Sequence, residues 1–116
     1  MTFTVLLPVP PSVNRAFRNV AGKGRVKTRD YRQWRRNAVL SIFAQVTASR
    51  RIGGRVRITI NLPSKTKGDI DNRIKGLLDA LVDSRRIDDD KNVAQITVRR
   101  DYPGDLAAII VAADDP

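Results

Sequence analysis

The chain has 116 residues, of which 41% are hydrophobic and 29% charged, and this is typical of one globular domain spanning residues 1–116. It contains no Cys and no His, which excludes disulfides, Cys-based zinc sites, thiol nucleophiles, Ser-His-Asp triads and imidazole bases. Any chemistry must therefore use carboxylates, amines, guanidinium groups, hydroxyls or a bound metal ion.

The net charge of +10 comes from the N-terminal half of the chain. Residues 1–53 hold eleven basic residues and a single acid, Asp30, whereas residues 54–116 hold eleven of each sign. Such an asymmetry favours a polyanionic partner, and nucleic acid first. A membrane surface is the weaker interpretation, because the sequence has no long apolar segment and no signal peptide. We therefore expect a cytoplasmic protein with no membrane partner.

The first 27 residues are predicted to form a strand followed by loops. Residues 2–7 are typical of a strand that stops at Pro8. The proline-rich residues 8–14 cannot continue a sheet or start a regular helix, so they are expected to form a turn or loop. Residues 15–27, which include Gly22 and Gly24, are expected to form a mobile basic loop.

A long helix is predicted from residue 29 to about residue 49, with Thr28 as its cap. Apolar residues recur at helical spacing and indicate a stripe that faces the core. That stripe consists of Trp34, Ala38, Ile42 and Val46, with Tyr31, Val39 and Phe43 beside them. The spacing of Arg29, Arg32 and Arg36 places them together on another face.

The C-terminal half is predicted to alternate strands and one helix. Residues 55–62 alternate apolar and polar side chains as a strand does, and a basic loop follows at residues 64–68. Residues 71–83 show the strongest amphipathic pattern of the chain and predict a helix. Two further strands are expected at residues 93–100 and 106–112.

Residues 102–105, Tyr-Pro-Gly-Asp, have turn chemistry, so we expect the last two strands to form a hairpin. The predicted fold is therefore α/β (α+β). It has a mixed sheet and two main helices, in the order β-α-β-α-β-β.

An acidic motif at the start of the second predicted helix indicates chemistry. Asp69 and Asp71 converge if the backbone there is extended, and Lys75 and Asp79 follow Asp71 on one helix face. The acidic residues 88–90 can return a further carboxylate to the same point. Clustered carboxylates repel one another unless a cation neutralises them, so the pattern favours Mg²⁺, or Mn²⁺ in its place. Beside a basic surface, such an ion can activate water and offset the charge of a phosphodiester.

Each of these residues also has a purely structural interpretation. An Asp at a helix start is often only a cap, and an acidic triplet is more often a solvated loop than a ligand set. Lys75 alone would usually pair with Asp71 and Asp79. The basic half would then be a solubilising face. The combination of all these features favours the catalytic interpretation.

The sequence resembles the RusA-type Holliday junction resolvases, small endodeoxyribonucleases of bacteria and their phages. The resemblance covers nearly the whole chain, beginning with the Pro-Pro-Ser-x-Asn signature at residues 10–14. It continues through Asp-Ile-Asp-Asn at 69–72, Lys75, Asp-Ala-Leu at 79–81 and Ile-x-Asp-Asp at 87–90. One departure is that Arg85 and Arg86 stand where the family commonly has Gly or apolar residues.

The resemblance implies a homodimer that binds four-way DNA junctions and makes Mg²⁺-dependent, paired, symmetric nicks in DNA recombination and repair, without a nucleotide cofactor. It identifies Asp69, Asp71 and Asp90 as the catalytic, metal-binding carboxylates and Lys75 as the essential lysine. Asp89 is the second choice for the third ligand. The expected host is a bacterium or a phage-infected cell.

Recognition is expected to depend mainly on the DNA backbone and the shape of the junction. The candidate phosphate contacts are Asn14, Arg15, Arg18, Lys23, Arg25, Lys27, Lys65 and Lys67, of which the last two flank Asp69 most closely. Two alternatives remain open: a non-catalytic, architectural DNA-binding protein, and an RNA-binding protein of ribosomal type. The second is disfavoured because six aromatic residues, with Trp34 and Phe43 expected in the core, leave little for base stacking.

Overall fold

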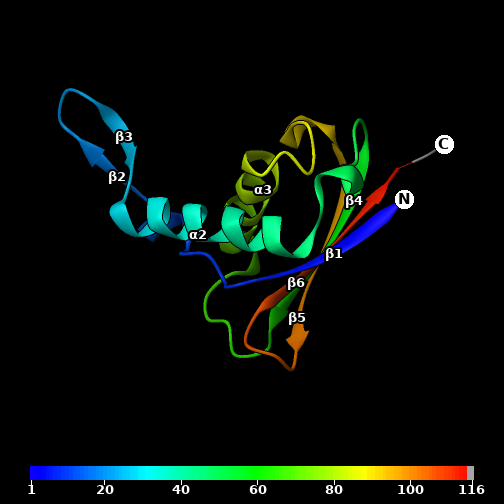
Figure 1. Cartoon of the computed structure of the whole chain (residues 1–116). Coiled ribbons are helices and arrows are strands. Elements are labelled where there is room, and N and C mark those ends of the chain that lie inside the picture. Colours follow the sequence, from blue (N-terminus) through cyan, green and yellow to red (C-terminus); the bar gives the residue numbers. More distant parts are fainter. Residues whose placement is uncertain (115–116) are drawn as a thin grey trace.

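A four-stranded mixed sheet with two helices on one face forms the body of the protein (Figure 1). The computed structural model describes residues 1–114. The strands are β1 (Thr2–Leu7), β4 (Val56–Pro63), β5 (Val93–Tyr102) and β6 (Ala107–Ala113), in the order β1-β6-β4-β5. β6 is antiparallel to both of its neighbours, whereas β4 and β5 are parallel. The predicted fold class and the order of the main elements are confirmed.

Alternating apolar side chains of β1 and β4 face the helices. Along β4, Val56, Ile58, Ile60 and Leu62 are buried, as the alternation predicted. In β1, every second residue from Phe3 to Leu7 is buried in the same way. β5 lies at the edge of the sheet and is exposed along most of its length. Its charged residues fit that position, because charges on an edge strand discourage pairing with other chains.

The predicted hairpin of the last two strands is wrong. β4 lies between β5 and β6 and pairs with both of them. The connection after Tyr102 still reverses the chain, but it crosses one strand. Two strands that flank a third lie about 10 Å apart, and four extended residues span up to about 13 Å, so the four residues between β5 and β6 are long enough to cross β4. The turn chemistry was therefore compatible with either pairing.

Helix α2 (Arg29–Gln45) packs against β1 and against the second helix. The Thr28 hydroxyl caps its N-terminus and accepts a hydrogen bond from the Tyr31 N–H at 3.3 Å. The helix ends four residues earlier than predicted, and the 3₁₀ turn η1 (Ala48–Arg50) follows it. The predicted stripe is buried at Tyr31, Ala38, Ile42 and Val46 and partly buried at Trp34 and Val39. Phe43 was wrongly assigned to the core, since it is 51% exposed.

Helix α3 (Ile74–Asp83) buries Leu77, Ala80 and Leu81 against the sheet and α2, as its pattern predicted. Its first turn, expected to begin at residue 71, is instead the 3₁₀ segment η2 (Ile70–Arg73). A third 3₁₀ segment, η3 (Asp90–Asn92), leads into β5. Within residues 1–114, no helix has both the length and the apolar character that a membrane span requires.

The basic segment after the prolines is folded, which corrects the prediction of a mobile loop. It forms a one-turn helix, α1 (Val13–Ala16), and a hairpin of β2 (Phe17–Val20) and β3 (Gly24–Lys27). Gly22 and Gly24 adopt positive φ angles of 79° and 73°, which glycine adopts without strain and which reverse the chain between the strands. The hairpin projects from the body beside the N-terminal end of α2 (Figure 1).

Candidate active site

A cavity of about 410 Å³ lies beside the N-terminal half of α3. Its polar lining consists of Asp71, Lys75, Asp79 and Asp90, and two apolar residues of α3 complete it. Asp71 belongs to η2 and Asp90 to η3, so two segments separated by the whole of α3 meet at this point. Three of the four predicted catalytic residues therefore share one cavity. Asp69, the fourth, does not line it and is the N-cap residue of η2.

The capping interpretation of the acidic motif finds no support in the geometry. Asp69 occupies the N-cap position of η2 in an extended conformation, with φ −72° and ψ 140°. Its side chain nevertheless makes no capping hydrogen bond. Asp69 and Asp71 are both exposed. The two carboxylates were expected to converge if the backbone there is extended, but the extended conformation stops at Asp69, because Ile70 and Asp71 already belong to η2.

The three residues of the acidic triplet have different surroundings. Asp88 forms an ion pair with Arg51. Asp89 caps η3 and accepts a hydrogen bond from the Lys91 N–H at 3.0 Å, and this bond lowers the pKa of Asp89 below its usual value. Asp90 lines the cavity with Asp71. The structural interpretation of the triplet thus fits Asp88 and Asp89, and Asp90 is the member at the site.

The proline-rich segment packs against the start of α3 and holds the site in place. The Arg73 guanidinium donates hydrogen bonds to the carbonyl oxygens of Pro10, at 2.6 Å, and of Lys67, at 3.3 Å. Gly76 lies so close that a Cβ atom there would be 2.7 Å from Pro10 Cβ. Arg100 of β5 donates to the carbonyl oxygen of Gly68, directly before the acidic motif. Contacts from three parts of the chain therefore fix η2.

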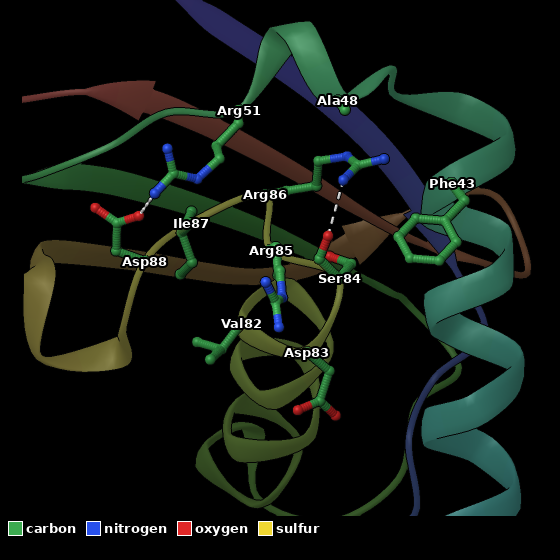
Figure 2. A pocket seen from close by; sticks show the side chains of 10 residues that line it. All are labelled: Phe43, Ala48, Arg51, Val82, Asp83, Ser84, Arg85, Arg86, Ile87 and Asp88. Atoms are coloured by element: carbon green, nitrogen blue, oxygen red, sulfur yellow. Dashed lines mark hydrogen bonds and ion pairs between the residues drawn. The ribbon is translucent and has the colours of Figure 1, made fainter.

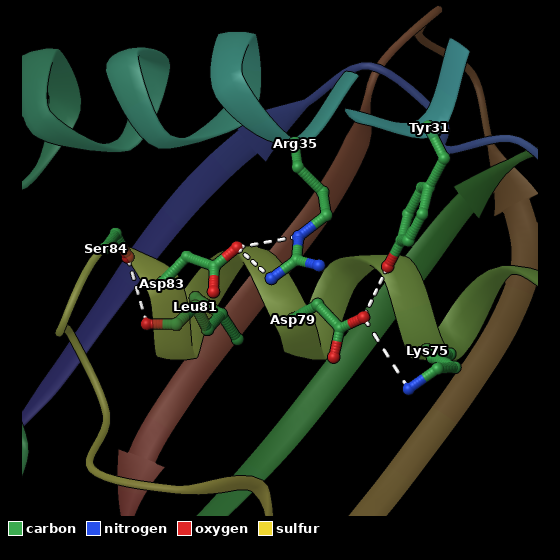
Figure 3. Close-up of polar contacts among 7 residues, drawn as sticks. All are labelled: Tyr31, Arg35, Lys75, Asp79, Leu81, Asp83 and Ser84. Atoms are coloured by element: carbon green, nitrogen blue, oxygen red, sulfur yellow. Dashed lines mark hydrogen bonds and ion pairs between the residues drawn. The ribbon is translucent and has the colours of Figure 1, made fainter. Parts of the chain in front are cut away.

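Tyr31 and Asp79 extend the site towards the core. Sequence reasoning placed Asp79 on the helix face of Asp71 and Lys75 without a catalytic role, and it did not connect Tyr31 with the site. The Tyr31 hydroxyl donates a hydrogen bond to Asp79 Oδ2, and Lys75 Nζ lies 3.7 Å from the same oxygen (Figure 3). Burial, and then the contact with Asp79, raises the pKa of Tyr31 well above its usual range. Tyr31 was recognised only as a member of an apolar stripe. Its phenolic oxygen was the signal that a polar partner must lie nearby.

The carboxylates suit a hard cation in donor type, since all of them offer oxygen ligands of the kind that Mg²⁺ prefers. Asp71 and Asp90 border the same cavity and are both exposed. Among residues 1–114, however, no group of three acidic side chains is gathered closely enough to hold a metal ion. Side-chain rotation at these exposed positions would be required to complete a ligand set.

The predicted DNA contacts are exposed and form two groups. Asn14 and Arg15 lie on α1, Arg18, Arg25 and Lys27 on the hairpin strands, Lys23 in the hairpin turn, and Lys65 and Lys67 in the loop after β4. Lys65 forms an ion pair with Asp105, which offsets part of its charge. α1 contacts η2, so the first group begins directly beside the acidic motif.

The basic surface also continues from the hairpin onto α2. Arg18, Arg29 and Arg32 border a hollow of about 340 Å³ between these elements. Arg29, Arg32 and Arg36 are all exposed, in agreement with the predicted shared face. The nearness of Arg29 and Arg32 to the hairpin could not be predicted from the sequence, because the hairpin itself was expected to be a mobile loop.

A second cavity, of about 720 Å³, lies at the other end of α3 and contains none of the predicted site residues (Figure 2). Arg85 there has a positive φ of 58°. Its N–H bonds to the Val82 carbonyl and the Arg86 N–H to the Leu81 carbonyl, which is the Schellman pattern of a helix end. The Arg86 side chain is buried and donates to two backbone carbonyls. The Arg86 side chain thus has a structural role at this helix end, whereas Arg85 occupies the left-handed position of the motif.

Comparisons with known proteins place the chain in one enzyme family. Residues 8–112 match the family described as Endodeoxyribonuclease RusA. The crossover junction endodeoxyribonuclease rusA of Enterobacteria phage HK97 is 33% identical to the chain over 104 residues, which cover 84% of this chain and 82% of the phage protein. The family match includes the proline-rich segment, the hairpin and every residue of the cavity.

Proposed function

Because the chain belongs to the RusA family of endodeoxyribonucleases, we propose that it resolves four-way DNA junctions by hydrolysing phosphodiester bonds. Residues 1–116 would form one such endonuclease domain, acting in recombination and repair in the cytoplasm of a bacterial or phage-infected cell. The observation that supports this proposal best is the cavity that Asp71, Lys75 and Asp90 share, directly beside a basic hairpin.

Asp69, Asp71 and Asp90 are the proposed ligands of Mg²⁺, with Mn²⁺ as a substitute. The bound ion would supply an activated water and offset charge on the phosphate. Asp90 is preferred to Asp89 because the Asp89 carboxylate already caps η3. Lys75 lines the cavity with a half-exposed side chain, and its ammonium group can approach a phosphate oxygen there.

The exposed basic residues of α1, of the hairpin and of the loop after β4 are the proposed phosphate contacts. The first group reaches the acidic motif through the contact of α1 with η2, and the second lies in the loop that runs into it, which supports recognition of the DNA backbone rather than of base sequence. Paired nicks on opposed strands require two identical active sites related by a two-fold axis. We therefore propose that the active form is a homodimer.

The experiment is cleavage of a labelled synthetic four-way junction with Mg²⁺ or with EDTA, with duplex DNA and structured RNA at equal salt for comparison. Wild type is compared with Asp71→Asn and with Asp101→Asn, a carboxylate on β5 that pairs with Arg99 at 2.7 Å. We expect metal-dependent, paired nicks from wild type and Asp101→Asn. Asp71→Asn should lose cleavage and keep or gain affinity, because it removes charge that repels phosphate.

Other outcomes would contradict the proposal in distinct ways. Tight junction binding without nicking under Mg²⁺ or Mn²⁺ would identify a non-catalytic DNA-binding protein. An equal affinity for junction and duplex DNA would show that the protein does not select four-way junctions. Wild-type cleavage by Asp71→Asn would show that the cavity is not the catalytic site.

A further inference from the structure

A polar chain links the core of α2 to the proposed catalytic lysine. Tyr31 is 1% exposed, and its hydroxyl donates to Asp79 Oδ2. The Asp79 side chain is 17% exposed and lies 3.7 Å from Lys75 Nζ through that same oxygen (Figure 3). Burial, and then the contact with Asp79, raises the pKa of Tyr31, which favours the protonated phenol that donates this hydrogen bond. A buried hydrogen-bond donor on the core side therefore holds the Asp79 carboxylate in place.

Lys75 is also bounded by an aromatic ring from the hairpin. Its Nζ lies 5.9 Å from the centre of the Phe17 ring, within the range of a cation–π contact. Phe17 in turn packs against Tyr31, with ring centres 5.4 Å apart. The ammonium group thus lies between Asp79 and Phe17, at the cavity that Asp71 lines. Residues at the base of the proposed DNA-binding hairpin help to define where the lysine can point.

Holding α2 and α3 together does not require this arrangement. One turn further along α3, Asp83 forms an ion pair with Arg35 of α2, with Oδ2 2.7 Å from Nε and 2.5 Å from Nη2 (Figure 3). Burying the Asp79 carboxylate against a neutral phenol carries a desolvation penalty that a purely apolar contact would avoid. The contact that distinguishes Asp79 from Asp83 is Lys75, which faces the cavity.

We propose that Asp79 is a positioning residue for the cleavage reaction: held by Tyr31, it directs the Lys75 ammonium towards the phosphate in the cavity. Phe17 limits the lysine on its other side. This inference rests on the proposed function, and it assigns roles to side chains that lie behind the carboxylates and the lysine already described.

The first test measures single-turnover cleavage of the four-way junction at saturating protein, together with the dissociation constant for the junction. Asp79→Asn should lower the cleavage rate on the order of 10- to 100-fold, as is usual for partners that orient a catalytic group. Tyr31→Phe, which keeps the ring volume and the fold, should lower it in the same direction by less. In both variants the dissociation constant should change by less than about twofold, because neither residue contacts DNA directly.

Asp83→Asn is the matched control, since it breaks an ion pair between the same two helices away from the cavity. It should cleave at the wild-type rate. If all three variants slow cleavage in proportion to a loss of thermal stability, the effect of Asp79 is structural and the inference is wrong. A higher Mg²⁺ requirement with an unchanged maximal rate in Asp79→Asn would make Asp79 a metal ligand, which also overturns it.

The decisive readout is a double-mutant cycle with Lys75→Gln. If Asp79 acts through the lysine, adding Asp79→Asn to Lys75→Gln should change the rate by less than about twofold. If the two substitutions instead lower the rate independently, so that their effects multiply, the inference is wrong. The proposed function would still hold, because the wild-type protein would still cleave the junction.

A measurement without catalysis separates the two proposals completely. Relaxation of the Lys75 ¹³Cε resonance reports how firmly the side chain is held. The order parameter of the Lys75 side chain should fall in Asp79→Asn and in Tyr31→Phe but not in Asp83→Asn. Unchanged order in Asp79→Asn would overturn the positioning role, whatever the wild-type protein does to a junction.

Discussion

Asp71 and Asp90 line one cavity although the whole of α3 lies between them in the chain. The pairing arises because α3 carries the chain away from η2, and the segment after it returns beside the same helix to enter β5 at η3. Lys75 borders the same cavity from the first turn of α3. With Asp79, the cavity thus combines three acids and a base from three consecutive elements. The larger cavity at the other end of α3 has the opposite balance, with three arginines and two acids in its lining.

Salt dependence tests the role of the hairpin. Each phosphate contact adds about 0.9 to the slope of log K against log salt for B-form DNA. Replacing both Arg18 and Lys23 with Gln should therefore lower the slope by about 1 to 2 if both contact phosphates. Junction affinity is measured by fluorescence anisotropy over a range of salt concentrations.

The control for this series is Arg55→Gln with Arg57→Gln. These two side chains pair with Asp114, at 2.6 and 3.4 Å, and lie on and beside β4 rather than on the hairpin. Their loss should leave the slope unchanged. An equal reduction in both double variants would mean that only net charge matters and that the hairpin is not the contact surface.

Gly76 tests the packing of the proline-rich segment against α3. Alanine would gain about 1 kcal/mol of helix propensity, but its Cβ would lie 2.7 Å from Pro10 Cβ, and overpacking costs about 1–3 kcal/mol. Because the proline ring cannot rotate away, we expect Gly76→Ala to destabilise the fold by up to about 2 kcal/mol in urea denaturation. Gly53→Ala, whose Cβ meets nothing closer than 3.4 Å, should be neutral or slightly stabilising. A stabilised Gly76→Ala would show that this contact is loose.

Arg85 occupies the position of the Schellman motif where glycine is most common, with φ 58°. Arg85→Gly should therefore stabilise the fold by roughly 0.5–1 kcal/mol, since it removes the strain of a left-handed residue. Arg86→Ala should do the opposite, because Arg86 is 7% exposed and donates to the carbonyl oxygens of Val46 and Ser84. Thermal unfolding measures both effects. A lower melting temperature for Arg85→Gly would mean that its side chain contributes more than its backbone strain costs.

Local patterns were sufficient for the elements that form the core. The alternation in β4 and the helical spacing around Leu77 and Leu81 each encode one buried face, so strand and helix followed directly. The acidic motif and Lys75 were likewise recognisable from their spacing, and the structure brings Asp71, Lys75 and Asp90 to one cavity.

Long-range pairing was not encoded locally. The insertion of β4 between β5 and β6 depends on which strands bury the most apolar surface together, and the turn at residues 102–105 is compatible with either arrangement. The hairpin was missed because Arg18, Lys23 and Arg25 dominate its composition, whereas two glycine conformations determine its shape. Phe43 has helical spacing with the core but lies beside Arg86, 5.0 Å from its guanidinium, at the surface.

The most direct test of the proposed active site compares variants of two adjacent carboxylates, Asp89 and Asp90, in single-turnover cleavage of a four-way junction with Mg²⁺. Asp89→Asn should cleave at close to the wild-type rate, because asparagine also caps a helical turn well. Asp90→Asn should lose cleavage by about a thousandfold or more and still bind the junction, because it removes a carboxylate from the cavity. Wild-type cleavage by Asp90→Asn, with cleavage lost in Asp89→Asn, would contradict the assignment of this cavity as the active site.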